Sequence, residues 1–322
     1  MSKPDIGLLR RPSLDILAPG RGVSRAWHNL DDLGRTHRFV NVAASHTAAG
    51  ERPSIRVRII QFVLLANAIP AFFMLTLVPG RTADIFVWTV RPDASARLLA
   101  AMYGNAAILV LMTLRRRAWS DIRVAFVVFT LFSWAATIVT FLHLDPFLAH
   151  PRYFFAYWLA NYFFLFLATP VVFALEERTH GGRLTVTEPL PRGLRAAAIL
   201  AALTCLFAGA SMLAGPRFVN DLWPWPMTPL VASIIGVWLS ALGAAYAWAL
   251  WDGDGRRSRP IFAQGLPTAV LVGIVPFAHR ADLAGGVGHY ILFAALVGTL
   301  AVAAAAALPQ RRTHTVKSGA VE

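Results

Sequence analysis

The stretch NDLWPWPMTP, residues 220–229, shows how this chain is built. It places two tryptophans, three prolines and an aspartate directly before a long apolar segment that begins at residue 230. A segment of about 20 apolar residues is long enough to cross the hydrocarbon core of a bilayer. Tryptophan is enriched where such a segment meets the membrane surface, and proline stiffens the chain there. The stretch is therefore predicted to be an interfacial loop that leads into a transmembrane helix.

Eight apolar segments of this kind follow one another along the 322 residues. Hydrophobic residues make up 57% of the chain and charged residues only 15%, and the charges gather between the apolar segments. Backbone groups in hydrocarbon must be hydrogen-bonded within their own segment, and the two-residue alternation of membrane strands is missing, so helices are expected. The sequence predicts an all-α integral membrane protein with eight transmembrane helices at 59–78, 96–114, 122–142, 153–175, 194–214, 230–251, 261–278 and 287–308.

The basic residues predict how these helices are oriented. The net charge is +13, and 24 Lys and Arg lie in the two terminal tails and in the loops after the second, fourth and sixth segments, against 5 in the other four loops. By the positive-inside rule, both termini are expected on the cytoplasmic side of the plasma membrane. Because the arginines flank apolar segments, topology accounts for the excess charge, and no nucleic-acid partner is predicted.

A second copy of the opening stretch is found earlier in the chain. The segment PGRTADIFVWTVRP (79–92) matches PRFVNDLWPWPMTP (216–229) at a constant offset of 137, through Pro79, Asp84, Trp88 and Pro92 against Pro216, Asp221, Trp225 and Pro229. The ends of the third and seventh apolar segments also match, as FLHLD and FAHRAD. This match aligns His143 and Asp145 with His279 and Asp282.

The second and sixth segments share a ladder of small residues, which lets helix backbones approach closely. The ladder pairs Ala96, Ala100 and Gly104 with Ala232, Gly236 and Ser240, each 136 residues apart.

These matches predict two parallel four-helix repeats. Because four is an even number, both copies would have the same orientation and be related by a pseudo-twofold axis along the membrane normal, as in some transporters. The expected layout is a cytoplasmic basic tail (1–57, mostly disordered or lying on anionic lipid), repeat 1 (58–178), a cytoplasmic linker (179–193), repeat 2 (194–308) and a cytoplasmic C-terminal tail (309–322).

Two regions have a distinctive sequence: HLDPF with the aromatic-rich helix YFFAYWLANYFFLFLATP that follows, and WPWPMTPLVASIIGVW. They resemble a family of uncharacterised multi-pass membrane proteins of high-GC, actinobacterial-type bacteria. The resemblance covers the second to sixth helices best and does not extend to the seventh and eighth. It implies the fold and the membrane location. Since the family has no assigned activity, it supplies no chemistry.

The predicted outer loops collect histidines, aspartates and tryptophans at matching places in the two repeats. Imidazole and carboxylate groups bind metals, and histidine also titrates near neutral pH. The same residues would serve equally as helix caps and as partners of outer arginines, and their spacing is not a known metal signature. The candidate vestibule residues are Asp84, Trp88, His143, Asp145, Asp221, Trp225, His279 and Asp282, with His143 and His279 as the metal ligands if a metal is bound; whether a cofactor is bound is unknown from the sequence.

The leading hypothesis is that the protein binds a small solute, or passes it by secondary or passive transport, through an outward-facing vestibule. No Asp or Glu falls at mid-depth in a helix, so the carboxylates typical of many proton- and sodium-coupled pumps are missing. The signatures of familiar enzymes are also missing, which points away from catalysis. The alternative is a scaffold subunit whose small-residue ladders bind another membrane protein or a second copy of the chain. A third hypothesis is an outward-facing metal- or haem-handling protein.

Overall fold

The computed structural model describes residues 52–181, 185–215, 222–283, 286 and 288–307. The predicted terminal tails lie almost entirely outside the described residues, as do Pro216 and Asp221. In the described part of the chain, the regular elements are helices, and the one β-type contact is an isolated bridge between Pro189 and Asp254. The predicted all-α class is confirmed for these residues.

Eight helices in this part of the chain are long and apolar enough to cross a membrane, and each overlaps one predicted segment. This confirms the prediction of a multi-pass, all-α architecture. They are α2 (Ile55–Leu77), α4 (Asp93–Leu114), α5 (Arg123–Leu142), α7 (Arg152–His180), α8 (Arg192–Ala214), α10 (Pro229–Asp252), a seventh helix built from α11 (Gly255–Ala263), α12 (Gly265–Gly273) and α13 (Val275–Ala278), and α14 (Gly288–Ala306).

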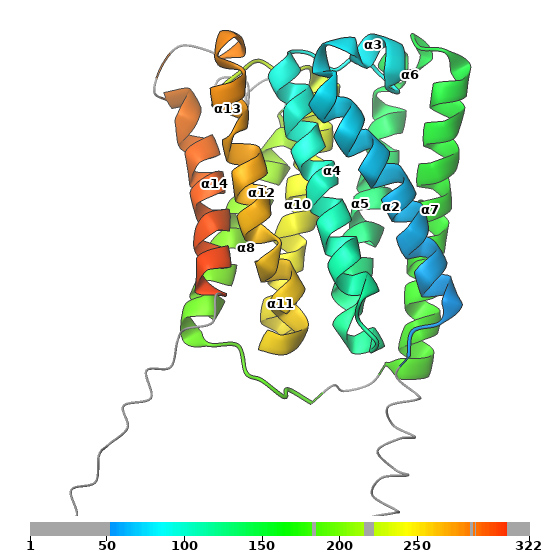
Figure 1. The fold of residues 1–322 in the computed structure, drawn as a ribbon, viewed down its shortest axis with the longest axis vertical. Coiled ribbons are helices and arrows are strands. Elements are labelled where there is room, and N and C mark those ends of the chain that lie inside the picture. The colour runs from blue at the N-terminus through cyan, green and yellow to red at the C-terminus, as the bar shows by residue number, and fades with distance from the viewer. Residues whose placement is uncertain (1–51, 182–184, 216–221, 284–285, 287, 308–322) are drawn as a thin grey trace, which may run out of the picture. The chain divides into compact units, whose positions relative to one another are not determined.

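The short elements lie at the two ends of the helix bundle. The elements η2 (Pro79–Arg81), α3 (Thr82–Ile85), α6 (Leu144–Leu148) and η4 (Arg280–Asp282) follow the upper ends of long helices in Figure 1, and we call this end the upper end. The opposite, lower end carries α11 and η3 (Trp119–Asp121). By the predicted topology, the upper end faces outward.

The seventh helix is interrupted because of its prolines. Proline has no N–H to donate to the carbonyl four residues earlier, and its ring clashes with that carbonyl. The helix breaks at Gln264, three residues before Pro267, and again at Ile274, two residues before Pro276. The sequence predicts a single helix here. In the structure, three short helices follow one another along the same span.

The long helices form a closed cycle of contacts. Each helix contacts the next in the order α2, α4, α12, α14, α8, α10, α5 and α7, and α7 contacts α2 again (Figure 1). Across the cycle, α4 and α10 also contact each other. The most buried helices are α10, α4 and α5. They therefore form the centre of one continuous apolar core.

The predicted ladders of small residues lie inside this core. A Cβ atom added to Gly209 of α8 would lie 2.8 Å from the carbonyl oxygen of Gly236 and would also meet Ser240. Ala232, in the same ladder, is fully buried. In the other ladder, Gly104 lies against the ring of Phe72, and Ala96 and Ala100 are fully buried. The ladder of α10 thus packs against its neighbour α8.

Candidate functional site

The tryptophans of the two upper loops are buried, and each packs on the fourth long helix of its own half. Trp88 makes an edge-to-face contact with Phe86 at 4.8 Å between ring centroids, and it contacts Trp158 of α7 at 5.1 Å. Trp225 repeats this arrangement with Trp223 at 5.7 Å, and with Phe293 of α14 at 5.7 Å. Both indoles anchor their loops to the bundle.

The predicted acidic residues of the upper loops have different surroundings. Asp84 is exposed and pairs with Arg81 at 3.4 Å, and Asp145 is also exposed. Asp282 is half-buried, and its Oδ2 accepts the N–H of Ala94 at 2.9 Å in the first turn of α4. A carboxylate is favourable there, because the N-terminus of a helix carries partial positive charge. Asp221 lies outside the described residues.

Each of the two predicted histidines directly follows a helix. His143 ends α5, and its Nδ1 lies 3.2 Å from the carbonyl oxygen of Val139. His279 ends α13, and its Nδ1 lies 3.6 Å from Oδ2 of Asp282. The structure thus brings His279 and Asp282 together, whereas His143 and His279, both described, share no hydrogen bond or ion pair. In the described part, no group of three or more His, Cys, Asp or Glu residues is arranged to hold a metal ion.

A pocket of about 410 Å³ opens between α2, α4 and α7, below the loop that follows α3. Its walls are mostly apolar and aromatic, and four of its side chains carry hydroxyl or amide groups. We call it the aromatic pocket; it is lined by Asn67, Pro70, Ala71, Met74, Ile85, Phe86, Val87, Tyr103, Tyr153, Phe154, Tyr157 and Trp158. No charged side chain and no histidine is among them.

The floor of the aromatic pocket is polar. The hydroxyl oxygens of Tyr103 and Tyr162 lie 3.3 Å apart, and Asn67 Nδ2 lies 3.5 Å from the hydroxyl oxygen of Tyr157. Beyond this floor is a cavity of about 20 Å³, which shares Asn67 and Tyr103 with the pocket and is further lined by Tyr162 and Trp238. Trp238 is buried, and its indole N–H has no partner among the described residues. A space of this size suits a single water molecule that such groups would bind.

A larger and more open groove of about 730 Å³ lies between α13 and α14. Its lining is apolar apart from Arg280 and Tyr290, and the small residues Gly273 and Gly298 form part of its wall. It lacks the cluster of hydroxyl and amide groups that the aromatic pocket holds.

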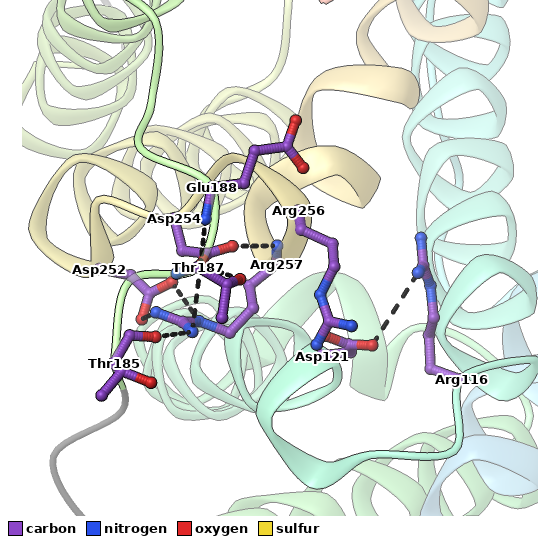
Figure 2. Close-up of polar contacts among 9 residues, drawn as sticks. All are labelled: Arg116, Asp121, Thr185, Thr187, Glu188, Asp252, Asp254, Arg256 and Arg257. Carbon is purple, nitrogen blue, oxygen red and sulfur yellow. Dashed lines mark hydrogen bonds and ion pairs between the residues drawn. The ribbon is translucent and has the colours of Figure 1, made fainter. Parts of the chain in front are cut away.

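At the lower end, Asp254 fastens the segment between the two halves (Figure 2). This aspartate is 0% exposed. Its Oδ1 accepts the N–H of Arg257 at 3.0 Å, which caps α11. Its Oδ2 accepts the N–H and the hydroxyl of Thr187, at 2.7 and 2.8 Å, and the N–H of Glu188 at 3.3 Å.

Arg257 completes this network, and Figure 2 shows its guanidinium between two carboxylates. It donates to both oxygens of Asp252, at 2.8 and 3.1 Å, and to the carbonyl of Thr185 at 3.0 Å, and it lies 3.3 Å from Asp254. We call Thr185, Thr187, Glu188, Asp252, Asp254 and Arg257 the clasp.

Opposing effects set the pKa of Asp254. Burial raises the pKa of this carboxyl, but the hydrogen bonds from Arg257, Thr187 and Glu188 outweigh burial and hold the pKa well below its usual range. The carboxylate is therefore charged at every physiological pH, and the clasp is a constant connection.

A second network at the lower end joins the loop after α4 to α11. Asp121 lies 3.4 Å from Arg256 and 3.9 Å from Arg116 (Figure 2). Nearby, the guanidinium of Arg123 stacks over the rings of Trp248 and Trp251 and lies 3.4 Å from Glu177. Ion pairs therefore connect several loops at this end of the bundle.

Neither the clasp nor the aromatic pocket is predicted from the sequence. The GDGRRSR segment reads as a short glycine-rich turn, and its one local signal is Asp254, because aspartate is favoured at a helix N-cap. The tyrosines and Asn67 lie within apolar segments, where only their polarity distinguishes them.

Comparison of the chain with family models, with curated proteins and with solved structures gave no match. The geometry of the site is therefore the basis for assigning a function.

Proposed function

We propose that the protein binds a small, uncharged, amphipathic solute in the aromatic pocket and admits it from the upper end of the bundle. The observation that carries this proposal is the lining of the pocket, in which apolar and aromatic walls surround three phenols and one amide. Ligand sites in proteins are typically apolar with a few convergent polar groups. The absence of charge in the lining disfavours an ion as the ligand, because a desolvated charge needs a partner.

This proposal moves the expected site away from the upper loops and into the bundle. The predicted vestibule residues cap helices, pack under loops or lie exposed, whereas the pocket is built from α2, α4 and α7. Passage through the protein would be secondary or passive. The clasp and the Asp121 pairs connect the loops of the lower end, so opening that end would require breaking the buried Arg257–Asp252 ion pair and the partly exposed Asp121–Arg256 pair.

We further propose that the chain lies in the plasma membrane with the upper end outward and consists of two parallel repeats. The helix boundaries support the duplication: α2 and α8 begin at 55 and 192 and end at 77 and 214, each pair 137 apart. The pairs α4 and α10 (93 and 229) and α7 and α14 (152 and 288) begin 136 residues apart.

The backbone and the contacts support the same relationship. Val78 and Gly215 follow α2 and α8 with φ/ψ of −134/56° and −144/66°, and His143 and His279 share φ/ψ of −133/52° and −128/50°. Exchanging α2 with α8, α4 with α10, α5 with the seventh helix and α7 with α14 leaves the cycle of contacts unchanged. A pseudo-twofold axis between α4 and α10 would produce this invariance.

The scaffold hypothesis requires a free surface on the small-residue ladders. Its basis is the ladders on the second and sixth helices, and the ladder of α10 packs against Gly209 within the same chain. That face is not free to receive a partner.

Photolabelling tests the solute site. The purified protein in lipid nanodiscs would be irradiated with a neutral phenol that carries a diazirine, with and without excess phenol, and the labelled peptides mapped by mass spectrometry. We expect competable labelling on α2, α4 and α7, and no competition by benzoate, which is charged. Labelling spread evenly over the lipid-facing helices would contradict the proposal.

Variants that remove single hydroxyl groups sharpen this test. Tyr103→Phe and Tyr157→Phe keep the rings and each remove one hydroxyl group that lines the pocket, so labelling should weaken by about 3- to 10-fold, as expected for a hydrogen bond worth about 0.5–1.5 kcal/mol. The matched control is Tyr246→Phe, a buried tyrosine of α10 whose hydroxyl has no partner in the described part and which does not line the pocket. An equal loss in the control would exclude a specific site.

A further inference from the structure

A hollow lined by arginines lies at the lower end, where α2 begins and α4 ends. Its volume is about 390 Å³, and its lining consists of Arg52, Pro53, Arg58 and Arg117. No carboxylate is among the lining residues. We call it the arginine hollow.

Arg58 is held in a fixed position in this hollow. Its guanidinium donates to Gln61 Oε1 at 2.9 Å and to the carbonyl oxygens of Leu114 and Arg116, at 2.9 and 2.6 Å. These carbonyls lie at the C-terminus of α4, where a cation interacts favourably with the helix dipole. All three acceptors are neutral groups, so the positive charge of Arg58 has no counter-charge from them.

The carboxylates near the arginine hollow interact with other groups. Glu176 accepts the N–H of Ser54 and lies 3.7 Å from His180, and Glu177 accepts the indole N–H of Trp119. Arg52, Arg58 and Arg117 make no ion pair with any described residue. Three positive charges therefore surround a space that is large enough for a phosphate group.

We propose that the arginine hollow binds the phosphate headgroup of an anionic phospholipid from the leaflet that meets the lower end. Guanidinium groups bind phosphate oxygens through paired, charge-assisted hydrogen bonds. Basic pockets beside transmembrane helices are suited to anionic headgroups. A zwitterionic lipid fits less well, because no carboxylate in the lining would receive its cationic group.

The surface of α2 beside the hollow favours a lipid over free phosphate. Ile55, Ile59 and Phe62 are 72%, 50% and 59% exposed, and their spacing places them along one face of the helix. This apolar stripe starts next to Arg58 and runs into the membrane-spanning part of α2, where acyl chains of a bound lipid would lie.

Native mass spectrometry of the full chain in a non-ionic detergent tests this proposal. Phosphatidylglycerol and phosphatidylcholine with identical acyl chains would be added separately, and the fraction of protein that retains each lipid measured. The test variant is the double substitution R52Q/R117Q, which removes two exposed lining charges. The matched control is R56Q/R115Q, which removes two exposed charges from the same region that do not line the hollow.

We expect the wild type to retain phosphatidylglycerol in preference to phosphatidylcholine. The affinity for phosphatidylglycerol should fall by roughly 10- to 30-fold in R52Q/R117Q and remain nearly unchanged in R56Q/R115Q. Equal losses in the two doubles would show general charge attraction and overturn the proposal. Displacement of the lipid by excess inorganic phosphate would identify free phosphate as the ligand and overturn it as well.

Discussion

The indole nitrogen of Trp225 lies 3.0 Å from the hydroxyl oxygen of Ser95, and this hydrogen bond joins the two halves at the upper end. Trp88 occupies the corresponding place in the first half, and its indole N–H is buried without a partner in the described part. The position that corresponds to Ser95 is 136 residues later, at Val231, which has no hydroxyl group. In the duplication that we propose, one of two equivalent bonds is missing.

Restoring that bond tests the proposed symmetry. Val231→Thr adds a hydroxyl without changing the side-chain shape, and the pseudo-twofold would place it before Trp88. A buried donor without a partner costs about 1–3 kcal/mol, and only a hydroxyl at position 231 would supply one to the Trp88 N–H, so Val231→Thr should be at least about 1 kcal/mol less destabilising than Val237→Thr, a control on the same buried helix. Thermal denaturation in detergent measures the difference. Equal destabilisation by both substitutions would count against the symmetric placement.

The contact between α8 and α10 predicts a large effect of one methyl group. A Cβ atom at position 209 would lie 2.7 Å from the backbone nitrogen of Ser240 and 2.8 Å from the oxygen of Gly236, so the two helices must separate. Gly209→Ala should lower the stability by about 1–3 kcal/mol. Gly298→Ala in α14 adds the same methyl group where nothing lies within 4 Å, and it should be neutral or stabilising by up to about 1 kcal/mol. Thermal denaturation of both variants would decide, and a stable Gly209→Ala protein would show that the close approach is not required.

Local patterns predict the spans of this protein well. Apolar runs identify the eight helices, and Pro267 and Pro276 mark the segment that the structure interrupts. These features depend on residues close together in the chain. The matching of Trp88 with Trp225 is also a sequence feature, and the structure adds that both indoles are buried.

The clasp and the aromatic pocket depend on contacts between distant residues. Thr187 and Asp254 are 67 residues apart, and no local pattern around either indicates the other. Tyr103 and Tyr162 lie in helices that are apolar on all sides, so no hydrophobic stripe indicates which face turns inward. The sequence therefore predicts the site among the polar residues of the loops, which are easy to recognise. In the structure, the pocket lies between α2, α4 and α7.

The clasp predicts that Asp254 contributes more to the stability of the fold than any exposed aspartate does. Asp254→Asn removes the charge opposite Arg257 and replaces an acceptor of several hydrogen bonds by an amide that also donates. Removing one partner from a buried ion pair costs about 3–5 kcal/mol, so we expect a loss of stability of that order. The matched control is Asp84→Asn, which disrupts an exposed pair with Arg81 and should leave the melting temperature unchanged. Equal melting temperatures for wild type and Asp254→Asn would show that the clasp contributes nothing.

The low pKa of Asp254 predicts how this effect depends on pH. A carboxyl whose pKa is lower in the folded than in the unfolded protein stabilises the fold fully above the unfolded value of about 3.9, and this stabilisation is lost as the pH falls toward the folded value. The stability difference between wild type and Asp254→Asn should therefore be constant from about pH 7 to about pH 5 and shrink below about pH 4. Thermal denaturation at several pH values measures it. A difference that grows on acidification would contradict the assigned direction.

The orientation of the bundle can be tested with its single cysteine as an internal control. Cys205 is fully buried, so a membrane-impermeant maleimide should leave the wild type unlabelled in intact cells. Ala83 and Arg115 are exposed and lie in the loops at opposite ends of the α2–α4 pair, and neither packs in the core. If the excess of arginine marks the cytoplasmic side, Ala83→Cys should react in intact cells and Arg115→Cys only after the membrane is permeabilised. Reaction of Arg115→Cys alone in intact cells would invert the topology. It would place the clasp and the arginine hollow on the outer surface and require the solute to enter the aromatic pocket from the cytoplasmic side.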